Sequence, residues 1–217
     1  MTSQPIRQDR DQDSHARGTD RSPGLLLVIS GPSGVGKTTI ARRVQSGLDG
    51  VFSISATTRP KSNQEVQGRD YHFVTDRRFR EMVDRGEFLE HAEVFGRYAY
   101  GTPAGPVEEQ LAAGRLVVLD IDVQGALQIR RNRPDACMIF ILPPSDEELL
   151  RRLRSRGRDD EEAVQRRFAE AKREIDLARS SGAYNAFVIN ELLEQAIEET
   201  IDLVRRRWAG CPPAEGD

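Results

Sequence analysis

The chain has 217 residues, of which 37% are hydrophobic and 31% are charged, and its formal net charge is −3. This length and composition suit a globular protein with one α/β domain and insertions, or with two small domains. The small net charge gives no general reason to expect nucleic-acid or membrane binding, and two cysteines are too few for a disulfide framework or a metal site.

The two ends of the chain differ in composition from the middle. Residues 1–23 are polar, with four arginines and four aspartates, and we expect them to be disordered and dispensable for catalysis. Residues 209–217 are expected to form a frayed end. No apolar stretch is long enough for a membrane-spanning helix, and the N-terminus lacks the apolar segment of a signal peptide, which predicts a cytoplasmic protein.

Strands and helices alternate along most of the remaining chain. Strands are predicted at 25–30, 51–55, 116–120, 137–142 and 186–189, and helices at 37–47, 122–131, 145–156, 160–180 and 191–207. This alternation predicts a parallel sheet flanked by helices.

Residues 56–105 interrupt the alternation. The segments "YHFV", "EFLEHAEVF" and "RYAYGT" are typical of short antiparallel strands, and they surround one predicted helix at 76–85. We therefore predict an inserted small lobe of mixed α/β structure at 56–105, which divides the core into residues 24–55 and 106–208.

The helix predicted at 160–180 has an apolar stripe with charged residues elsewhere. The residues of the stripe are Val164, Phe168, Ala171, Ile175 and Ala178. The preceding helix is joined to it by the arginine-rich "RSRGRDD". Two helices connected in this way are expected to form a movable lid over about 145–180.

The stretch "GPSGVGKTT", residues 31–39, matches a phosphate-binding loop between a strand and a helix. The nine residues predicted to bind ATP here are Gly31, Pro32, Ser33, Gly34, Val35, Gly36, Lys37, Thr38 and Thr39. The glycines let successive backbone N–H groups point into one concavity, which suits a polyphosphate. Lys37 is expected to reach the β- and γ-phosphates, and the Thr38 hydroxyl to ligate Mg²⁺. An accidental glycine-rich turn is disfavoured because the flanking strand and helix are also present.

A second group of motifs resembles the guanylate kinase family. In "SISATTRPKSNQEVQGRDYHF", residues 53–73, the family's Ser-x-Ser-x-Thr-Thr-Arg segment is followed by Gly-x-x-Tyr. The resemblance continues in "FLEHAEVFGRYAYGT", in "LDIDVQG" and in "FVIN", and it covers about residues 24–207. It implies a P-loop kinase core with a GMP-binding lobe and a helical lid, and the transfer of the γ-phosphoryl group of ATP to GMP with Mg²⁺. We expect dGMP to be accepted as well, because no predicted contact depends on the 2′-hydroxyl.

The resemblance implies that Glu90 faces guanine and that the hydroxyls of Ser55 and Thr102 contact the base. A carboxylate accepts two hydrogen bonds from the N1–H and 2-amino groups of guanine. Adenine has an acceptor at N1 and no 2-amino group, so it would leave the carboxylate unpaired. Without the resemblance, Glu90 would be interpreted as a solvated carboxylate on a strand.

For the phosphate of GMP, the resemblance points to Arg59, Tyr71 and Tyr100. A guanidinium can hold a phosphate through two hydrogen bonds, and the phenols add neutral donors. The sequence departs from the family at Ser62, where a second arginine is usual, and the adjacent Lys61 is the candidate substitute.

The segment "GRYAYGT" also has one residue more before Tyr-Gly-Thr than the common family form. Tyr98 is therefore an alternative to Tyr100.

Two aspartates follow the strand predicted at 116–120. The resemblance assigns Asp122 to the junction of acceptor and metal, and we assign Asp120 to the metal with Thr38. An aspartate at a strand end can also serve as the cap of the next helix, which is the alternative for both.

Four residues complete the implied site. Arg152, Arg156 and Arg167 match the lid arginines that stabilise charge on the transferred phosphoryl group, and Asn190 matches an asparagine near the donor nucleotide. Because the chain has 29 arginines and only three lysines, any single arginine could instead be an exposed helix charge.

Two other functions share parts of this pattern. A ribose 1,5-bisphosphate phosphokinase would share the loop and the lid but would need no guanine-binding carboxylate. A protein-interaction module of the guanylate-kinase type would lack the complete phosphate loop. The sequence leaves open whether the protein is a monomer or a homo-oligomer.

Overall fold

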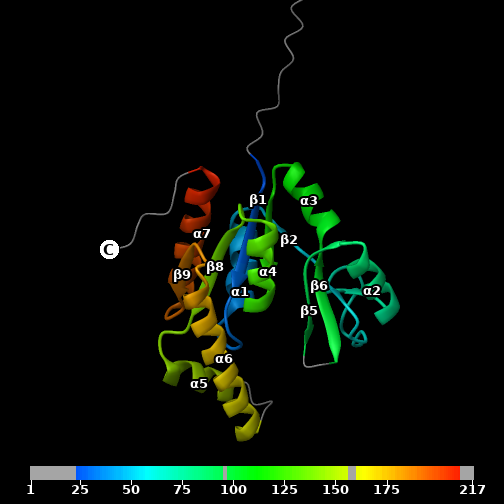
Figure 1. Cartoon of the computed structure of the whole chain (residues 1–217). Helices are drawn as coiled ribbons and strands as arrows, with labels where there is room; N and C mark the ends of the chain where they lie inside the picture. The colour runs from blue at the N-terminus through cyan, green and yellow to red at the C-terminus, as the bar shows by residue number, and fades with distance from the viewer. Residues whose placement is uncertain (1–22, 95–96, 156–159, 211–217) are drawn as a thin grey trace, which may run out of the picture.

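The computed structural model describes residues 23–94, 97–155 and 160–210, and it contains two sheets (Figure 1). The larger sheet has five strands, and all neighbouring strands are parallel. In spatial order they are β2 (Val51–Phe52), β7 (Leu116–Asp120), β1 (Leu25–Ser30), β8 (Cys137–Leu142) and β9 (Ala186–Ile189). β1 and β8 are buried along their whole length, as expected for continuous apolar runs in a sheet covered on both faces.

Helices cover both faces of the larger sheet. On one face, alternate residues of β1 such as Leu27 pack with α1 (Lys37–Gly47) and α7 (Leu193–Trp208). On the other face, Val28 packs in a second cluster with residues of the two remaining core helices. These helices are α3 (Ala104–Ala112) and α4 (Val123–Asn132). The phosphate loop therefore lies between a strand and a helix that are both fixed by the core.

The smaller sheet lies beside the core and carries one helix, at the right in Figure 1. Its strands in spatial order are β4 (His72–Phe73), β3 (Ala56–Thr57), β6 (Tyr98–Pro103) and β5 (Phe88–Val94). The helix is α2 (Asp76–Asp84), whose buried Phe79 stacks on Phe88 with ring centroids 4.6 Å apart. This sheet is mixed, because β3 pairs with β4 in parallel and with β6 antiparallel.

Helices α5 (Asp146–Ser155) and α6 (Glu161–Ser181) extend from the core at the lower left of Figure 1. The first half of α6 packs on α5 through Val164 and Ala171, and its second half packs on β8 and α4 through Ile175 and Ala178. The apolar stripe of the sequence thus serves two purposes. It attaches α6 to the core and joins α5 to α6.

The predicted fold class is confirmed, but three local predictions were wrong. The strand predicted at 51–55 ends at Phe52, because the chain then crosses to the smaller sheet at Ala56. The strand "YHFV" pairs in parallel rather than antiparallel. Helix α3 was not predicted, because Gly105 and Pro106 interrupt its apolar pattern, although proline is tolerated in a first helical turn.

Two further observations concern the limits of the described chain. Trp208 donates a hydrogen bond from its indole nitrogen to the carbonyl oxygen of Pro23 at 3.0 Å, so the last turn of α7 contacts the segment that leads into β1. None of the helices within the described ranges is both long and apolar enough to cross a membrane.

Candidate active site

The phosphate loop requires glycine for two physical reasons. Gly36, at the N-terminus of α1, has a φ of 93°, which other residues rarely adopt, and a Cβ there would lie 2.6 Å from Nδ2 of Asn190. At Gly31 a Cβ would lie 2.6 Å from the carbonyl oxygen of Ile141. The loop is therefore closely packed against β8 and the end of β9, which fixes its shape.

Asn190 supports the loop from within the protein. Its side chain is buried and donates from Nδ2 to the carbonyl oxygen of Val35 at 2.7 Å, while its backbone N–H donates to Leu142 at 2.8 Å. The carbonyl oxygen of Asn190 accepts a hydrogen bond from Arg152 at 3.0 Å. The predicted contact of Asn190 with the donor nucleotide stays a prediction, and the contact that the structure contains is with the loop.

Lys37, Thr38 and Asp120 come together where α1 begins and β7 ends. Lys37 Nζ lies 3.1 Å from Asp120 Oδ1 and donates to the carbonyl oxygen of Ile121 at 2.9 Å. The Thr38 hydroxyl donates to Asp120 Oδ2 at 2.6 Å. Because β1 and β7 are parallel neighbours, their carboxyl ends bring the loop and Asp120 to the same edge of the sheet.

The donor set at this edge suits Mg²⁺. Magnesium prefers oxygen ligands and is usually held by one or two carboxylates together with substrate phosphates. Thr38 and Asp120 supply one hydroxyl and one carboxylate. No group of three or more His, Cys, Asp and Glu side chains that could hold a metal occurs in the described parts of the chain. The remaining ligands of the ion would be phosphate oxygens and water.

Helices α5 and α6 approach the loop from the other side. Arg167 of α6 donates from Nη2 to the hydroxyl of Ser33 at 2.6 Å. Arg152 of α5 is held by Glu148 at 2.7 Å and by the carbonyl of Asn190. Of the predicted lid arginines, Arg167 thus contacts the loop directly and Arg152 contacts its support. Arg156 lies outside the described residues.

Glu90 and Thr102 form a buried pair across β5 and β6. They are cross-strand neighbours, and the Thr102 hydroxyl donates to Glu90 Oε1 at 2.6 Å. Glu90 is only 7% exposed, and burial raises the pKa of its carboxyl to about 7. A Cβ at Gly125 would lie 2.9 Å from Glu90 Oε2, so the first turn of α4 has room for the carboxylate only because this residue is glycine.

Asp122 is the N-cap of α4. Its Oδ1 accepts a hydrogen bond from the backbone of Gly125 at 2.8 Å, so the alternative role as a helix cap is confirmed for this residue. Its charge also raises the pKa of Glu90, although less than burial does. Asp122 is therefore close enough to the Glu90 site to act there as well.

Arg59, Tyr71 and Tyr100 gather on the smaller sheet. The guanidinium carbon of Arg59 lies 5.5 Å from the ring centre of Tyr71, whose ring is 5.9 Å from that of Tyr100. Burial raises the pKa of Tyr71, which keeps its phenol protonated as a hydrogen-bond donor. The predicted phosphate-binding set is thus together in space, with one cation and two phenols.

A cavity of about 410 Å³ lies between the end of the larger sheet and the smaller sheet. Predicted site residues from both sides line it: Thr38, Ser55, Tyr71, Thr102 and Asp120. Further polar residues that the sequence analysis did not assign also line it: Arg42, Gln45, Ser53, Glu65, Arg69 and Asp70.

Lys61 does not line this cavity. Its ammonium group donates to the carbonyl oxygen of Glu65 at 3.0 Å and lies 3.4 Å from that of Ser62, so it closes the turn to which it belongs. This geometry does not favour Lys61 as the substitute for the missing second arginine.

Two carboxylates near the site were missed by the sequence analysis. Glu65 pairs with Arg59, with 2.5 Å between Oε1 and Nη2. Glu174 of α6 is half-buried, and burial raises its pKa to about 7 while the charge of Lys37 lowers it. The signal for Glu174 was its position seven residues after Arg167, which places both on one face of a helix. Glu65 lies in an irregular turn, where spacing gives no such signal.

Residues 24–207 match the family model described as Guanylate kinase. A curated guanylate kinase from Anaeromyxobacter dehalogenans is 49% identical over 194 residues, 88% of this chain and 84% of the relative, and one from Gloeobacter violaceus is 51% identical over 174 residues, 80% and 83%. The solved structure of guanylate kinase from Anaplasma phagocytophilum is similar with a TM-score of 0.68 at 34% identity, covering 87% of this chain and 88% of that one.

Proposed function

The chain belongs to the guanylate kinase family and is an ATP:GMP phosphotransferase, and we propose that its two substrates meet across the cavity between the two sheets. One observation carries this proposal. The phosphate-loop residue Thr38 and the acceptor-side residues Tyr71 and Thr102 line the same cavity of about 410 Å³. A donor and an acceptor bound to these two groups would have their phosphates next to each other.

On the donor side, the backbone N–H groups of residues 31–39 would hold the β- and γ-phosphates of ATP. Lys37 lies at the start of α1, where its charge adds to the positive end of the helix dipole. Mg²⁺ would be held by Thr38 and Asp120, whose oxygens are already in contact, and when bound it would neutralise charge on the phosphates.

On the acceptor side, we assign the base to Glu90, Thr102 and Ser55. The hydrogen bond from Thr102 occupies one lobe of the Glu90 carboxylate and fixes its orientation. The remaining lone pairs can accept from the N1–H and 2-amino groups of guanine. Because the carboxylate is buried, a base that cannot donate these hydrogen bonds would leave an unpaired charge, which is costly.

The phosphate of GMP is assigned to Arg59, Tyr71 and Tyr100, which lie together on the smaller sheet. We further propose that dGMP is a substrate, because none of the assigned contacts requires the 2′-hydroxyl of the ribose. The acceptor oxygen of a nucleoside monophosphate is already anionic, so the reaction needs no general base. The task of the side chains is then to align two anions and to offset their repulsion.

Arg167 is the lid residue with the strongest support. It donates to the hydroxyl of Ser33 in the phosphate loop, and this contact supports a position next to the phosphates of a bound ATP. In this position it can stabilise the charge that spreads over the phosphoryl group during transfer. Arg152 supports the loop through Asn190, and Arg156 is assigned by the family motif alone.

The alternatives from the sequence analysis are less well supported. A protein-interaction module does not require the contacts among Lys37, Thr38 and Asp120, which suit a site for phosphate and metal. Ribose 1,5-bisphosphate has no base that could donate to the buried carboxylate of Glu90, which is paired with Thr102. A kinase for this sugar phosphate would not require that carboxylate.

Replacement of Lys37 by alanine tests the donor site. We expect kcat to fall by about 10²–10³-fold, the usual cost of one electrostatic donor in a reaction site. The measurement is GDP formation from ATP and GMP, followed by chromatography. Arg43→Ala is the matched control, because Arg43 is an exposed cation on the same helix that pairs with Glu194 of α7. Turnover of Lys37→Ala within a few-fold of the wild type would contradict the assignment.

A further inference from the structure

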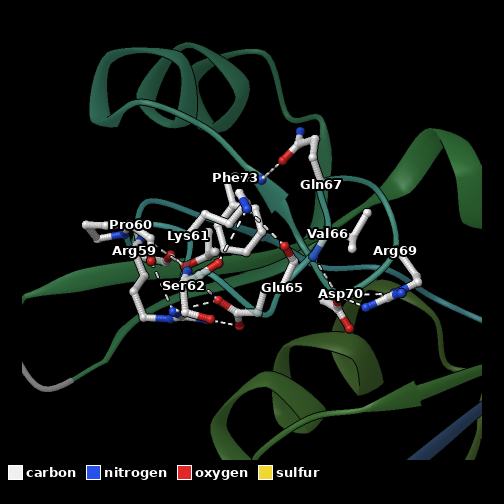
Figure 2. A network of polar contacts seen from close by, with 12 residues as sticks. Arg59, Pro60, Lys61, Ser62, Glu65, Val66, Gln67, Arg69, Asp70 and Phe73 are labelled. Carbon is white, nitrogen blue, oxygen red and sulfur yellow. Dashed lines mark hydrogen bonds and ion pairs between the residues drawn. The ribbon is translucent and has the colours of Figure 1, made fainter.

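A polar network that includes the assigned Arg59 surrounds Glu65, in the turn that follows Arg59 (Figure 2). Both oxygens of the Glu65 carboxylate face the guanidinium of Arg59. Oε1 accepts from Nη2 at 2.5 Å, and Oε2 accepts from Nη1 at 3.1 Å. Oε2 also accepts from the backbone N–H of Ser62 at 2.8 Å. Glu65 therefore joins Arg59 to the turn that contains Ser62.

From this geometry we propose that Glu65 is a positioning residue that holds Arg59 ready for the phosphate of the acceptor. The proposal rests on the proposed function, in which Arg59 binds that phosphate. Glu65 lines the cavity, but its carboxylate is assigned to Arg59 and not to the phosphate, which carries the same sign of charge.

The geometry leaves one edge of Arg59 available. A guanidinium has two edges that can form paired hydrogen bonds, one with Nη1 and Nη2 and one with Nε and Nη2. Glu65 takes the first edge. Among the described residues no hydrogen bond from Nε of Arg59 is found, although the Tyr100 side chain also hydrogen-bonds the guanidinium. The second edge can therefore donate to an anion, together with Tyr100, while the carboxylate stays in place.

Two aromatic rings also contact the same guanidinium. Its central carbon lies 5.5 Å from the ring centre of Tyr71 and 5.7 Å from that of Phe73, within the range of cation–π interactions. The rings and the two hydrogen bonds to Glu65 together restrict the orientation of the group. An arginine that is already ordered loses less conformational entropy when the phosphate binds.

Ser62 makes this ordering more important in this chain. Where the family pattern has a second arginine, Ser62 offers Glu65 its backbone N–H and its hydroxyl but no charge, and Lys61 is held by carbonyl groups of the turn. Arg59 is then the only cation among the three residues assigned to the phosphate. A site with one such cation depends strongly on how well that cation is placed.

Glu65 could also act in the opposite way, by competing with the phosphate for Arg59. The carboxylate stays ionised in either case, because Arg59 and the N–H of Ser62 hold its pKa down at about 2. The two accounts predict opposite changes in the affinity for GMP when the charge of Glu65 is removed. Competition predicts that removal of the charge improves GMP binding, whereas positioning predicts that it weakens GMP binding.

The test is a double-mutant cycle with Glu65→Gln, Arg59→Ala and the combined variant. We expect Glu65→Gln to raise the KM for GMP about three- to tenfold, as when one side chain must be ordered during binding, with kcat and the KM for ATP within about twofold of the wild type. In the Arg59→Ala background, Glu65→Gln is expected to have no further effect. Glu87→Gln is the matched control, because Glu87 pairs with Arg78 in the same part of the molecule, away from the cavity.

Guanosine as a competitive inhibitor separates positioning from a general loss of structure. It has the base and the ribose but no phosphate, so its inhibition constant should be the same for the wild type and Glu65→Gln. A lower KM for GMP in Glu65→Gln, an equal effect with and without Arg59, or an equal weakening of guanosine would each overturn the proposal. A wild-type protein that forms no GDP would instead contradict the proposed function, so the two failures can be told apart.

Discussion

At the residue scale, the protonation state of Glu90 determines how the acceptor base can be bound. Burial raises the pKa of this carboxyl from the ordinary 4.5 to about 7. Above that pH the ionised group can accept two hydrogen bonds from guanine. Below it, the proton on one oxygen faces the donors of guanine and one hydrogen bond is lost.

We therefore expect the KM for GMP to rise as the pH falls from about 8 to about 6, approaching tenfold per pH unit below the pKa of Glu90. The measurement is a series of steady-state titrations of GMP at saturating ATP. The KM for ATP serves as the internal control, since Glu90 lies in the acceptor site. A KM for GMP that stays constant across this range would contradict the role of Glu90.

The same burial predicts an effect on stability. Because the pKa of Glu90 is higher in the folded protein than in the unfolded chain, the folded state binds the proton more tightly. The free energy of unfolding attributable to Glu90 is then greatest below pH 4.5 and falls as the pH rises to about 7.

Glu90→Gln removes this ionisation and can still accept from Thr102. We expect it to raise the free energy of unfolding at pH 8 by about 1 kcal/mol while it raises the KM for GMP. Denaturant unfolding at pH 8 and pH 5 measures the first effect, which should be smaller at pH 5. A variant that is less stable at pH 8 would show that Glu90 is satisfied as an ion in the free protein.

At the scale of elements, α6 connects the reaction site to the outer helix α5. Its second half is fixed by Ile175 and Ala178 on the core, and its first half carries Arg167 to Ser33 of the phosphate loop. This arrangement makes Arg167 sensitive to how α6 lies against the core.

Arg167→Ala should lower kcat by about 10²–10³-fold with little change in the KM for GMP, because the charge is needed most during transfer. The comparison is Arg166→Ala, which removes the neighbouring arginine, paired with Glu162 on the exposed side of α6. Single-turnover kinetics measure the chemical step directly. Equal effects of the two substitutions would mean that Arg167 acts only through the stability of the helix.

Sequence patterns were sufficient to predict elements that depend on local composition, but not contacts that depend on how strands pair. The buried strand β1, the glycine loop and the N-terminus of α1 follow from local composition. The pairing of Glu90 with Thr102 depends on the register of β5 and β6, which was not predicted. The family resemblance implied only that both side chains contact the base.

Two kinds of contact could not be predicted: those between a side chain and a distant backbone group, and those within an irregular turn. Asn190 was assigned to the nucleotide, yet its amide is 2.7 Å from the carbonyl of Val35, 155 positions earlier in the chain. The pairing of Arg59 with Glu65 is local, but it depends on the shape of an irregular turn. Neither kind of contact has a sequence period.

At the scale of the whole molecule, the proposed site lies between two sheets. The parallel sheet presents the phosphate loop and Asp120 at one edge, and a cavity separates this edge from the smaller mixed sheet. If both substrates bind in this cavity as proposed, specificity and chemistry depend on different sheets, and a change on one should leave the other property intact.

The most direct test is the rate of ADP release from ATP by the wild-type protein with a panel of acceptors: GMP, dGMP, AMP, CMP, UMP and ribose 1,5-bisphosphate. We expect rapid release with GMP and dGMP and rates lower by about 10⁴-fold for the other nucleotides, because their bases cannot satisfy a buried carboxylate. Release with ribose 1,5-bisphosphate that equals or exceeds release with GMP, or no acceptor-dependent release at all, would contradict the account.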